Sequence, residues 1–310
     1  MKFNFNYFKH RYVILAVSLA VVVCGIIYGL VTGYTFDIDF KGGTRIQVAL
    51  NEEYNESDIK DIVESVCSQT PGIQTSSSGS YAITITTQVI SEDESNAIVE
   101  ALQEKYTQMG DATIKNVQAS YGQELINTAI ISVVISIALL LVYVAVRFRT
   151  LGYTAALSAV LALLFDTAFL FAVYGVFKFP INSTFVAVIL TIIGYSVNDT
   201  IVIYDRIREN RKLVTKSSDP TQVVNDSINQ TMSRTVVTSL TTLAAIGIVL
   251  IYAIIYDQDT LKQFSIPLCI GIAEGTLSSI FIATNLWCIF DNLIKKSKEK
   301  KKTKTKKAKA

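Results

Sequence analysis

The sequence predicts a polytopic α-helical membrane protein with six transmembrane helices and a small α+β extracytoplasmic domain between helices 1 and 2. Half of the 310 residues are hydrophobic and only 17% are charged, and the mean hydropathy of +0.39 is outside the range of soluble domains. Six apolar stretches approach or exceed the roughly 20 residues that cross a bilayer. A segment of soluble composition separates the first two stretches.

The apolar stretches set the expected domain boundaries. They cover residues 13–31, 125–146, 153–177, 181–203, 235–256 and 264–290. The first is too long for a signal peptide and lacks a small-residue cleavage site, so we expect it to stay as a helix. The expected parts are 1–12 (cytoplasmic N-terminus), 13–32 (transmembrane helix 1), 33–124 (extracytoplasmic domain), 125–204 (helices 2–4), 205–234 (cytoplasmic loop), 235–290 (helices 5 and 6) and 291–310 (basic cytoplasmic tail).

The charge distribution predicts the orientation of the chain. Lys and Arg gather before the first stretch, after the second, between the fourth and fifth, and after the last, and such clusters mark the cytoplasmic side. Both termini are therefore expected in the cytoplasm. Residues 33–124 hold fifteen Asp or Glu against five Lys or Arg, whereas ten Lys follow Leu293. We expect that tail to contact anionic lipid or ribosomal RNA rather than a specific nucleic acid.

Local patterns predict the elements outside the membrane. Alternating residues predict strands at 44–50 and 81–87 and a third near 116–121, and apolar periodicity predicts helices at 57–68, with an N-cap Ser, and 91–106. Residues 69–80 are expected to form a loop. Residues 220–232 predict a short amphipathic helix along the membrane surface, with a solvated linker as the alternative.

Asp199 is the most informative single residue, because it lies inside an apolar stretch. A carboxylate at bilayer depth costs roughly 2.5–3.5 kcal/mol on insertion scales, so the default interpretation is an ion or proton relay. The alternative is a structural carboxylate that bonds a neighbouring helix. Asp166 lies in the preceding stretch. If the two helices form a hairpin, we expect the carboxylates roughly 10–15 Å apart along the membrane normal, a gap that suits a water chain.

Other polar residues accompany these two carboxylates. The candidates that orient a carboxylate or line a hydrated path are Ser196, Asn198, Thr200, Asp205, Arg206 and Arg234. Interhelical hydrogen bonding is the alternative role for them. Glu274 lies in the last stretch between Gly271 and Gly275, which allow close helix packing. It is either a third relay member or a protonated donor inside a subunit interface.

Gly42 and Gly43 follow the first stretch and predict a hinge between the membrane and the outer domain. The chain has one His, at position 10, and no Cys spacing typical of zinc. It also has no phosphate-binding glycine loop and no serine nucleophile motif. We therefore expect no metal, no cofactor and no enzymatic activity.

Three segments resemble the motifs of the SecF family of bacterial protein-export membrane subunits. They are DFKGGT at 39–44, TIIGYSVNDTIVIYDRIREN at 191–210 and NQTMSRTVVTSLTTL at 229–243, and GTLSSIFIA at 275–283 resembles the family's last helix. The resemblance spans residues 36 to about 290. It implies half of a transporter of the resistance-nodulation-division superfamily, in the bacterial cytoplasmic membrane, and places the family's proton-linked aspartate at Asp199. Two positions depart from the family pattern: Phe165 stands where His is common, and Glu274 where an apolar residue is usual.

The resemblance also implies the partners and the function. The expected partners are SecD, the SecYEG channel with SecA on the cytoplasmic side, the translocating polypeptide and the lipid bilayer. The expected function is to couple the proton gradient to late-stage export or release of polypeptides, with protonation of Asp199 swinging the outer domain about Gly42 and Gly43. The alternatives are half of a proton-driven small-molecule or lipid exporter of the same superfamily, and a passive scaffold for the translocase.

Overall fold

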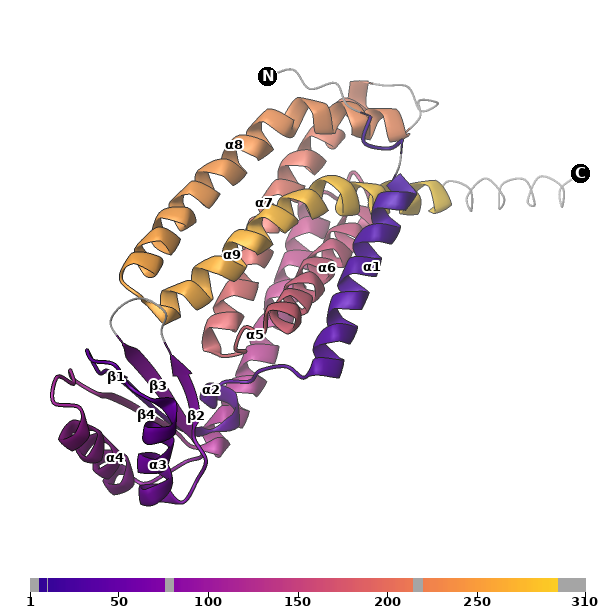
Figure 1. The fold of residues 1–310 in the computed structure, drawn as a ribbon. Coiled ribbons are helices and arrows are strands. Elements are labelled where there is room, and N and C mark those ends of the chain that lie inside the picture. Colours follow the sequence, from indigo (N-terminus) through magenta and orange to yellow (C-terminus); the bar gives the residue numbers. More distant parts are fainter. Residues whose placement is uncertain (1–5, 10, 76–80, 214–219, 295–310) are drawn as a thin grey trace, which may run out of the picture.

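The computed structural model describes residues 6–9, 11–75, 81–213 and 220–294. This part contains six helices that are long and apolar enough to cross a membrane, and a small sheet domain lies between the first and second of them. Figure 1 shows the helices side by side, with the sheet domain at one end of the bundle. The predicted fold class is confirmed. Residues 76–80 of the expected loop, and most of the expected tail, lie outside the described residues.

The helices of the bundle differ in how much of their surface the rest of the chain covers. They are α1 (Arg11–Thr32), α5 (Ala119–Arg147), α6 (Tyr153–Phe177), α7 (Ser183–Leu213), α8 (Pro220–Ile255) and α9 (Asp259–Ser278), which continues into the π-helical turn η1 (Ser279–Ala283). α6, α7 and α9 form the buried centre, and α1 packs on α6. α5 and α8 leave most of their apolar side chains exposed.

The sheet domain is a four-stranded antiparallel sheet with helices on one face. Its strands are β1 (Gly43–Ala49), β2 (Gly72–Thr75), β3 (Ala82–Thr87) and β4 (Thr113–Val117), in the order β2-β3-β1-β4. The helices α3 (Glu56–Cys67) and α4 (Glu92–Lys105) pack against alternate strand residues, and the buried core contains Ile46, Val48, Ile83, Ile85, Ile59, Val63, Ile98 and Leu102. A capping box between Ser91 and Glu94 starts α4.

Several predicted elements differ from the structure. The N-cap of α3 is Asn55, not a serine, because its side chain accepts the backbone N–H of Ser57. Residues predicted as loop include β2, which pairs with β3 beyond the turn at Pro71. The third strand ends at Val117 rather than 121, because α5 begins at Ala119 and only Gln118 separates it from β4.

The expected surface helix at 220–232 is not a separate element. α8 runs without interruption from Pro220 to Ile255, and α7 extends to Leu213, so the expected loop at 205–234 is helical in its described part. The predicted apolar face exists, but Val224 and Ile228 are buried in the main core. Ser227 accepts a hydrogen bond from the Asn210 amide at 2.8 Å. This face therefore packs on the end of the bundle (Figure 1).

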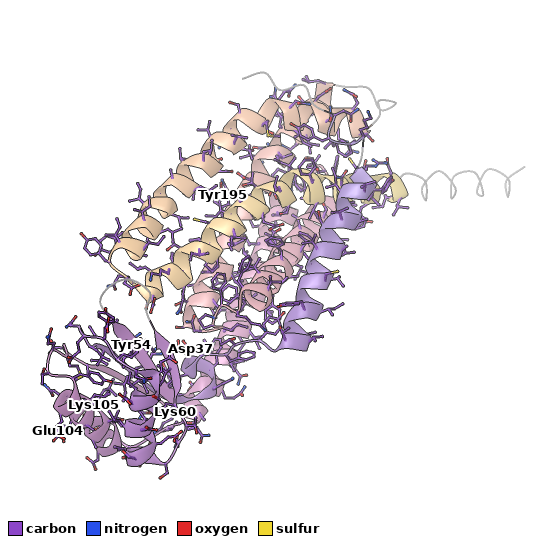
Figure 2. The ribbon with its side chains drawn as sticks, in the orientation of Figure 1. Asp37, Tyr54, Lys60, Glu104, Lys105 and Tyr195 are labelled. Atoms are coloured by element: carbon purple, nitrogen blue, oxygen red, sulfur yellow. The ribbon has the colours of Figure 1, made fainter. Side chains whose placement is uncertain are left out.

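A short helix connects α1 to the sheet domain. This helix, α2 (Ile38–Lys41), packs against the start of α5. Its N-cap, Asp37, accepts a hydrogen bond from Ile38 N–H, and Gly42 ends it with φ 76° and ψ 158°. Figure 2 shows Asp37 where the domain meets the helices. The predicted hinge glycines therefore lie in a packed junction, and the hinge motion stays a prediction.

Candidate functional site

Close approach of α7 and α9 creates the polar centre of the bundle. A Cβ at Gly271 would lie 2.0 Å from Ile192 Cδ1, and one at Gly275 would lie 3.2 Å from Ser196 Cβ. Glycine at both positions therefore lets the two helices touch, as the four-residue spacing predicted. The contact brings the polar side chains of α9 against those of α7.

Asp166 occupies the first polar layer of this centre. Its side chain is fully buried and accepts a hydrogen bond from Ser196 Oγ to Oδ2 at 2.5 Å. The side chains of Ser278 and Glu274 from α9 also act on Asp166. Helices α6, α7 and α9 thus meet at one carboxyl group.

Asp166 lies closer to the level of Asp199 than predicted. Its partner Ser196 precedes Asp199 by three residues of α7, a rise of about 4.5 Å. The expected separation of 10–15 Å along the normal is therefore wrong. One cause is that α7 begins at Ser183, two residues later than predicted, because residues 181 and 182 continue the connection after α6.

Asp199 forms a second polar layer. It is buried, its Oδ2 has no hydrogen-bond partner among the described residues, and the Thr276 hydroxyl of α9 and the positive charge of Arg234 both act on it. Thr276 Oγ1 lies 2.8 Å from Ser239 Oγ, and Tyr195 donates a hydrogen bond to Ser239 at 2.9 Å. Figure 2 places Tyr195 among the membrane helices. A chain of hydroxyl groups therefore connects Asp199 to α7, α8 and α9.

The other predicted site residues lie either in the polar centre or outside it. Thr200 joins the centre, because its Oγ1 lies 2.9 Å from Ser279 Oγ of η1. Asn198 is exposed on the opposite face of α7. Asp205 bonds Arg147 at 2.8 Å and Arg208 at 2.6 Å at the helix ends. Arg206 pairs with Glu209 and Gln230 near the same end.

Sequence reasoning missed Thr276, Ser239 and Tyr195 as members of the centre. The hydroxyl groups of Thr276 and Ser239 inside apolar stretches were a usable signal, since polar residues often bond between membrane helices. The π-helical turn η1 was also not predicted. Its residues Ser279 and Ala283 each form a hydrogen bond with a residue of α7. Such turns are frequent at functional sites but have no sequence signature of their own.

A second polar cluster fastens the sheet domain to the helices. Asp37 pairs with Arg45 of β1 and accepts a hydrogen bond from Asn182 at 3.3 Å. Asp39 pairs with Lys115 of β4 at 2.7 Å and accepts a hydrogen bond from Ser183 Oγ at 2.8 Å. These contacts connect α2, the sheet and the start of α7. Asp39 is the first residue of the quoted segment DFKGGT and Asp37 lies two residues before it, but the sequence analysis predicted no role for either.

The ionisation of this cluster follows from its contacts. Burial opposes the charge on Asp39, but hydrogen bonds from Lys115 and Ser183 outweigh it and hold the pKa of Asp39 below its ordinary value. Burial also lowers the pKa of Arg45. Asp39 is therefore ionised at neutral pH and keeps its partners in place.

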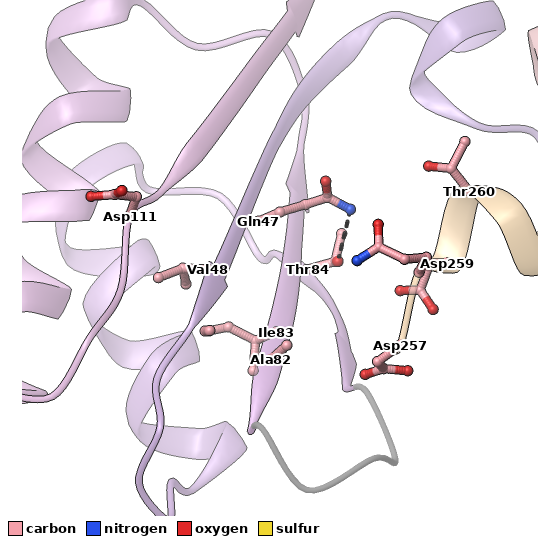
Figure 3. Close-up of a pocket in the computed structure, with 11 residues that line it drawn as sticks. Gln47, Val48, Ala82, Ile83, Thr84, Asp111, Asp257, Asp259 and Thr260 are labelled. Atoms are coloured by element: carbon pink, nitrogen blue, oxygen red, sulfur yellow. Dashed lines mark hydrogen bonds between the residues drawn. The ribbon is translucent and has the colours of Figure 1, made fainter. Parts of the chain in front are cut away.

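A polar cleft lies between the open face of the sheet and the helix ends. Its larger part, about 650 Å³, is lined by both aspartates of the cluster together with Arg45, Lys115 and Gln263. A smaller part of about 230 Å³ continues along the sheet. Figure 3 shows Gln47 and Thr84 of the strands facing Asp259 and Thr260 at the start of α9. Within the described residues, no group of three or more His, Cys, Asp or Glu is arranged to hold a metal ion.

Comparison with known proteins identifies the family. Residues 97–293 match the family model described as protein export membrane protein SecD/SecF, C-terminal. The chain is 33% identical over 295 residues to the protein translocase subunit SecF of Dictyoglomus turgidum, covering 94% of this chain and 98% of that protein. It is also 33% identical over 273 residues to the protein translocase subunit SecDF of Bacillus subtilis, covering 87% of this chain and 36% of that protein.

A solved structure agrees with this assignment. The crystal structure of SecDF from Thermus thermophilus, described as a translocon-associated membrane protein, superposes with a TM-score of 0.80 at 29% sequence identity. The match covers 93% of this chain and 39% of that chain, so this chain spans about two fifths of the SecDF protein. The chain therefore belongs to the SecD/SecF family of protein-export membrane proteins.

Proposed function

We propose that this chain is an accessory subunit of the Sec protein translocase that acts with SecD to couple the proton gradient to late-stage export of polypeptides. The observation that carries the proposal is the position of Asp199. Its carboxyl group is buried, and Thr276 of α9 and the positive charge of Arg234 of α8 act on it. A charge change at such a group alters the packing of the helices around it, because a buried charge is stable only with its partners.

The proposed route from Asp199 to the rest of the bundle passes through Thr276 and Ser239. Ser239 belongs to α8, which contacts α7 and α9 but leaves most of its surface exposed. Loss of the charge on Asp199 changes which hydroxyl donates to which along this chain. α8 then shifts against α7 and α9, and most of its outer surface is uncovered by the rest of the chain and does not oppose the movement.

The structure supports a partner subunit on the exposed face of α7. Asn198 is exposed there, and a Cβ at Gly194 would meet no atom within 4 Å. A polar amide on an apolar helix is costly in lipid, and small residues permit close helix contact. We assign this face to SecD, in keeping with relatives in which one SecDF chain contains the matching part.

The proposed orientation puts the sheet domain outside the cell and both termini in the cytoplasm of a bacterium. Arg147, Arg208 and Arg211 lie at the ends of α5 and α7 away from the sheet domain, and basic residues favour the cytoplasmic side. The polar cleft then faces the outer side, where an exported polypeptide emerges. We propose SecYEG as the channel and SecA as the cytoplasmic motor with which this chain acts.

The test is export of a secretory protein into vesicles that contain this chain, SecD and SecYEG, with and without a proton gradient. We expect Asp199→Asn to remove the gradient-dependent part of export and to leave the ATP-driven part. Asp226→Asn is the matched control, because Asp226 is exposed at the start of α8. Gradient stimulation of Asp199→Asn equal to wild type would reject the proposed role of Asp199.

A further inference from the structure

The carboxyl groups of Asp166 and Glu274 lie against each other in the membrane part of the chain, where α6 packs on α9. Asp166 comes from α6 and Glu274 from α9, and the side chain of each acts on the other. Two ionised carboxylates have only acceptor oxygens and cannot bond each other. The contact therefore requires a proton on one of the two groups.

The oxygens of the pair lack other donors. Asp166 Oδ1 and Glu274 Oε2 are both buried, and neither has a hydrogen-bond partner from a donor group in the described structure. Ser196 and Ser278 are the neighbouring hydroxyl groups, and Ser196 already donates to the other oxygen of Asp166. A proton held by the pair supplies the donor that these two oxygens need, because a buried acceptor without a donor is costly.

No positive charge balances the pair within the described residues. The groups that act on it are Ser196 of α7, Ser278 and Glu274 of α9 and Asp166 of α6, and none of them is a lysine or arginine. Arg234 acts instead on Asp199. Two negative charges in contact without a counter-ion are unstable in a low-dielectric site, and carboxyl pairs of this kind share one proton.

Glu274 also borders an apolar groove on the side of the bundle. The groove has a volume of about 690 Å³ and is lined by α1, α6 and α9, with Val17, Phe165 and Phe169 among its walls. Apart from Glu274, its lining residues from these helices are apolar or serine. The groove thus offers no cation that would replace the proton, and most of its lining side chains are apolar.

We propose that Asp166 and Glu274 form a second protonation site, separate from Asp199, that holds one proton between its two carboxyl groups. The pair carries a net charge of −1 with that proton in place. Its use in transport rests on the proposed function, but the protonation itself does not.

Infrared spectroscopy of the full-length chain in lipid vesicles tests this site directly. A protonated carboxyl group gives a C=O stretching band that an ionised one lacks, and the band shifts in D₂O. We expect wild type at neutral pH to show such a band, and Glu274→Gln and Asp166→Asn each to lose the same single band. The double variant should lose nothing more. Glu124→Gln, an exposed residue of α5, should leave the band unchanged.

Isotope labelling gives the same information without a substitution, in case Asp166→Asn fails to fold. With ¹³C in the side-chain carboxyl of either Asp or Glu, a shared proton makes the band shift under both labels. Two bands that each respond to one label would mean two independent acids and would overturn the proposal. A band present in choline chloride but absent in sodium chloride would also overturn it, because the pair would then bind a metal ion instead.

The result is distinguishable from a failure of the proposed function. Asp199→Asn should keep the shared band, since neither Asp166 nor Glu274 is among the groups that act on Asp199. Loss of gradient-driven export in Asp199→Asn with an intact band would support both proposals. An intact band together with unaltered export would reject only the role of Asp199.

Discussion

Substituting Gly42 by alanine should loosen the junction between α2, β1 and α5. Gly42 has φ 76° and ψ 158°, a region that is essentially restricted to glycine and costs other residues about 1–3 kcal/mol. An added Cβ would lie 2.8 Å from both N and Cα of Ala119. Those atoms belong to the backbone of α5 and cannot move aside as a side chain can.

The expected magnitude combines these two effects. Overpacking adds about 1–3 kcal/mol to the backbone strain, so Gly42→Ala should lower the local free energy of unfolding by about 2–6 kcal/mol. Gly33→Ala is the matched control, because Gly33 has φ 78° and nothing lies within 4 Å of its added Cβ. That variant has only the backbone strain, at a site outside the junction.

Amide hydrogen exchange of β1 measures the effect. Each 1.4 kcal/mol corresponds to about tenfold in the opening equilibrium, so exchange in β1 should accelerate at least about thirtyfold in Gly42→Ala. It should stay unchanged in Gly33→Ala. Equal β1 exchange in Gly42→Ala and wild type would refute the packed junction and favour the flexible hinge that the glycine pair predicted.

Three further changes test other contacts. Asp39→Asn should weaken the attachment of the sheet domain by about 1–3 kcal/mol, less than for a fully buried pair because Lys115 is half exposed. Since the pKa of Asp39 is held below its ordinary value, this contribution is complete above the ordinary Asp pKa and disappears as the pH falls through the folded value. Proteolysis of the junction against pH should therefore show an acid-induced loss in wild type that is missing in Asp39→Asn. Gly271→Leu should lower the thermal unfolding temperature by separating α7 from α9, whereas Gly247→Ala, in open space on α8, should keep or raise it; equal temperatures would contradict the close packing. Ser91→Ala should cost α4 about 1 kcal/mol in chemical unfolding and Ser91→Asp should restore it, because the N-cap acceptor returns; no loss in Ser91→Ala would show that the cap is dispensable.

The helical bundle could be predicted from the sequence because the patterns that indicate it lie within short stretches of the chain. Six long apolar stretches correspond to six helices, and the alternation in β1 and β3 predicted both central strands. Asp199 was found because a carboxylate in an apolar stretch is itself informative. The four-residue spacing of Gly271 and Gly275 predicted a close helix contact, which the structure assigns to α7.

The remaining features depend on how helices meet, which local patterns do not contain. The contact between Asp166 and Glu274 depends on the relative placement of α6 and α9, because the two residues are more than 100 positions apart in the chain. Ser239 reaches Thr276 only because α8 packs against α9. The extension of α8 through Ile228 reflects burial against the bundle end, which overrides the boundary that the polar residues suggested.

The single residue between β4 and α5 has a mechanical consequence. A connection of one residue, Gln118, is too short to let the domain rotate freely, and α2 packs against the start of the same helix. The sheet domain and α5 should therefore move as one rigid arm. A helix of 29 residues is about 44 Å long, so a tilt of about 5° displaces its far end by about 4 Å. A small tilt of α5 in the membrane therefore moves the sheet domain outside the membrane by several ångströms.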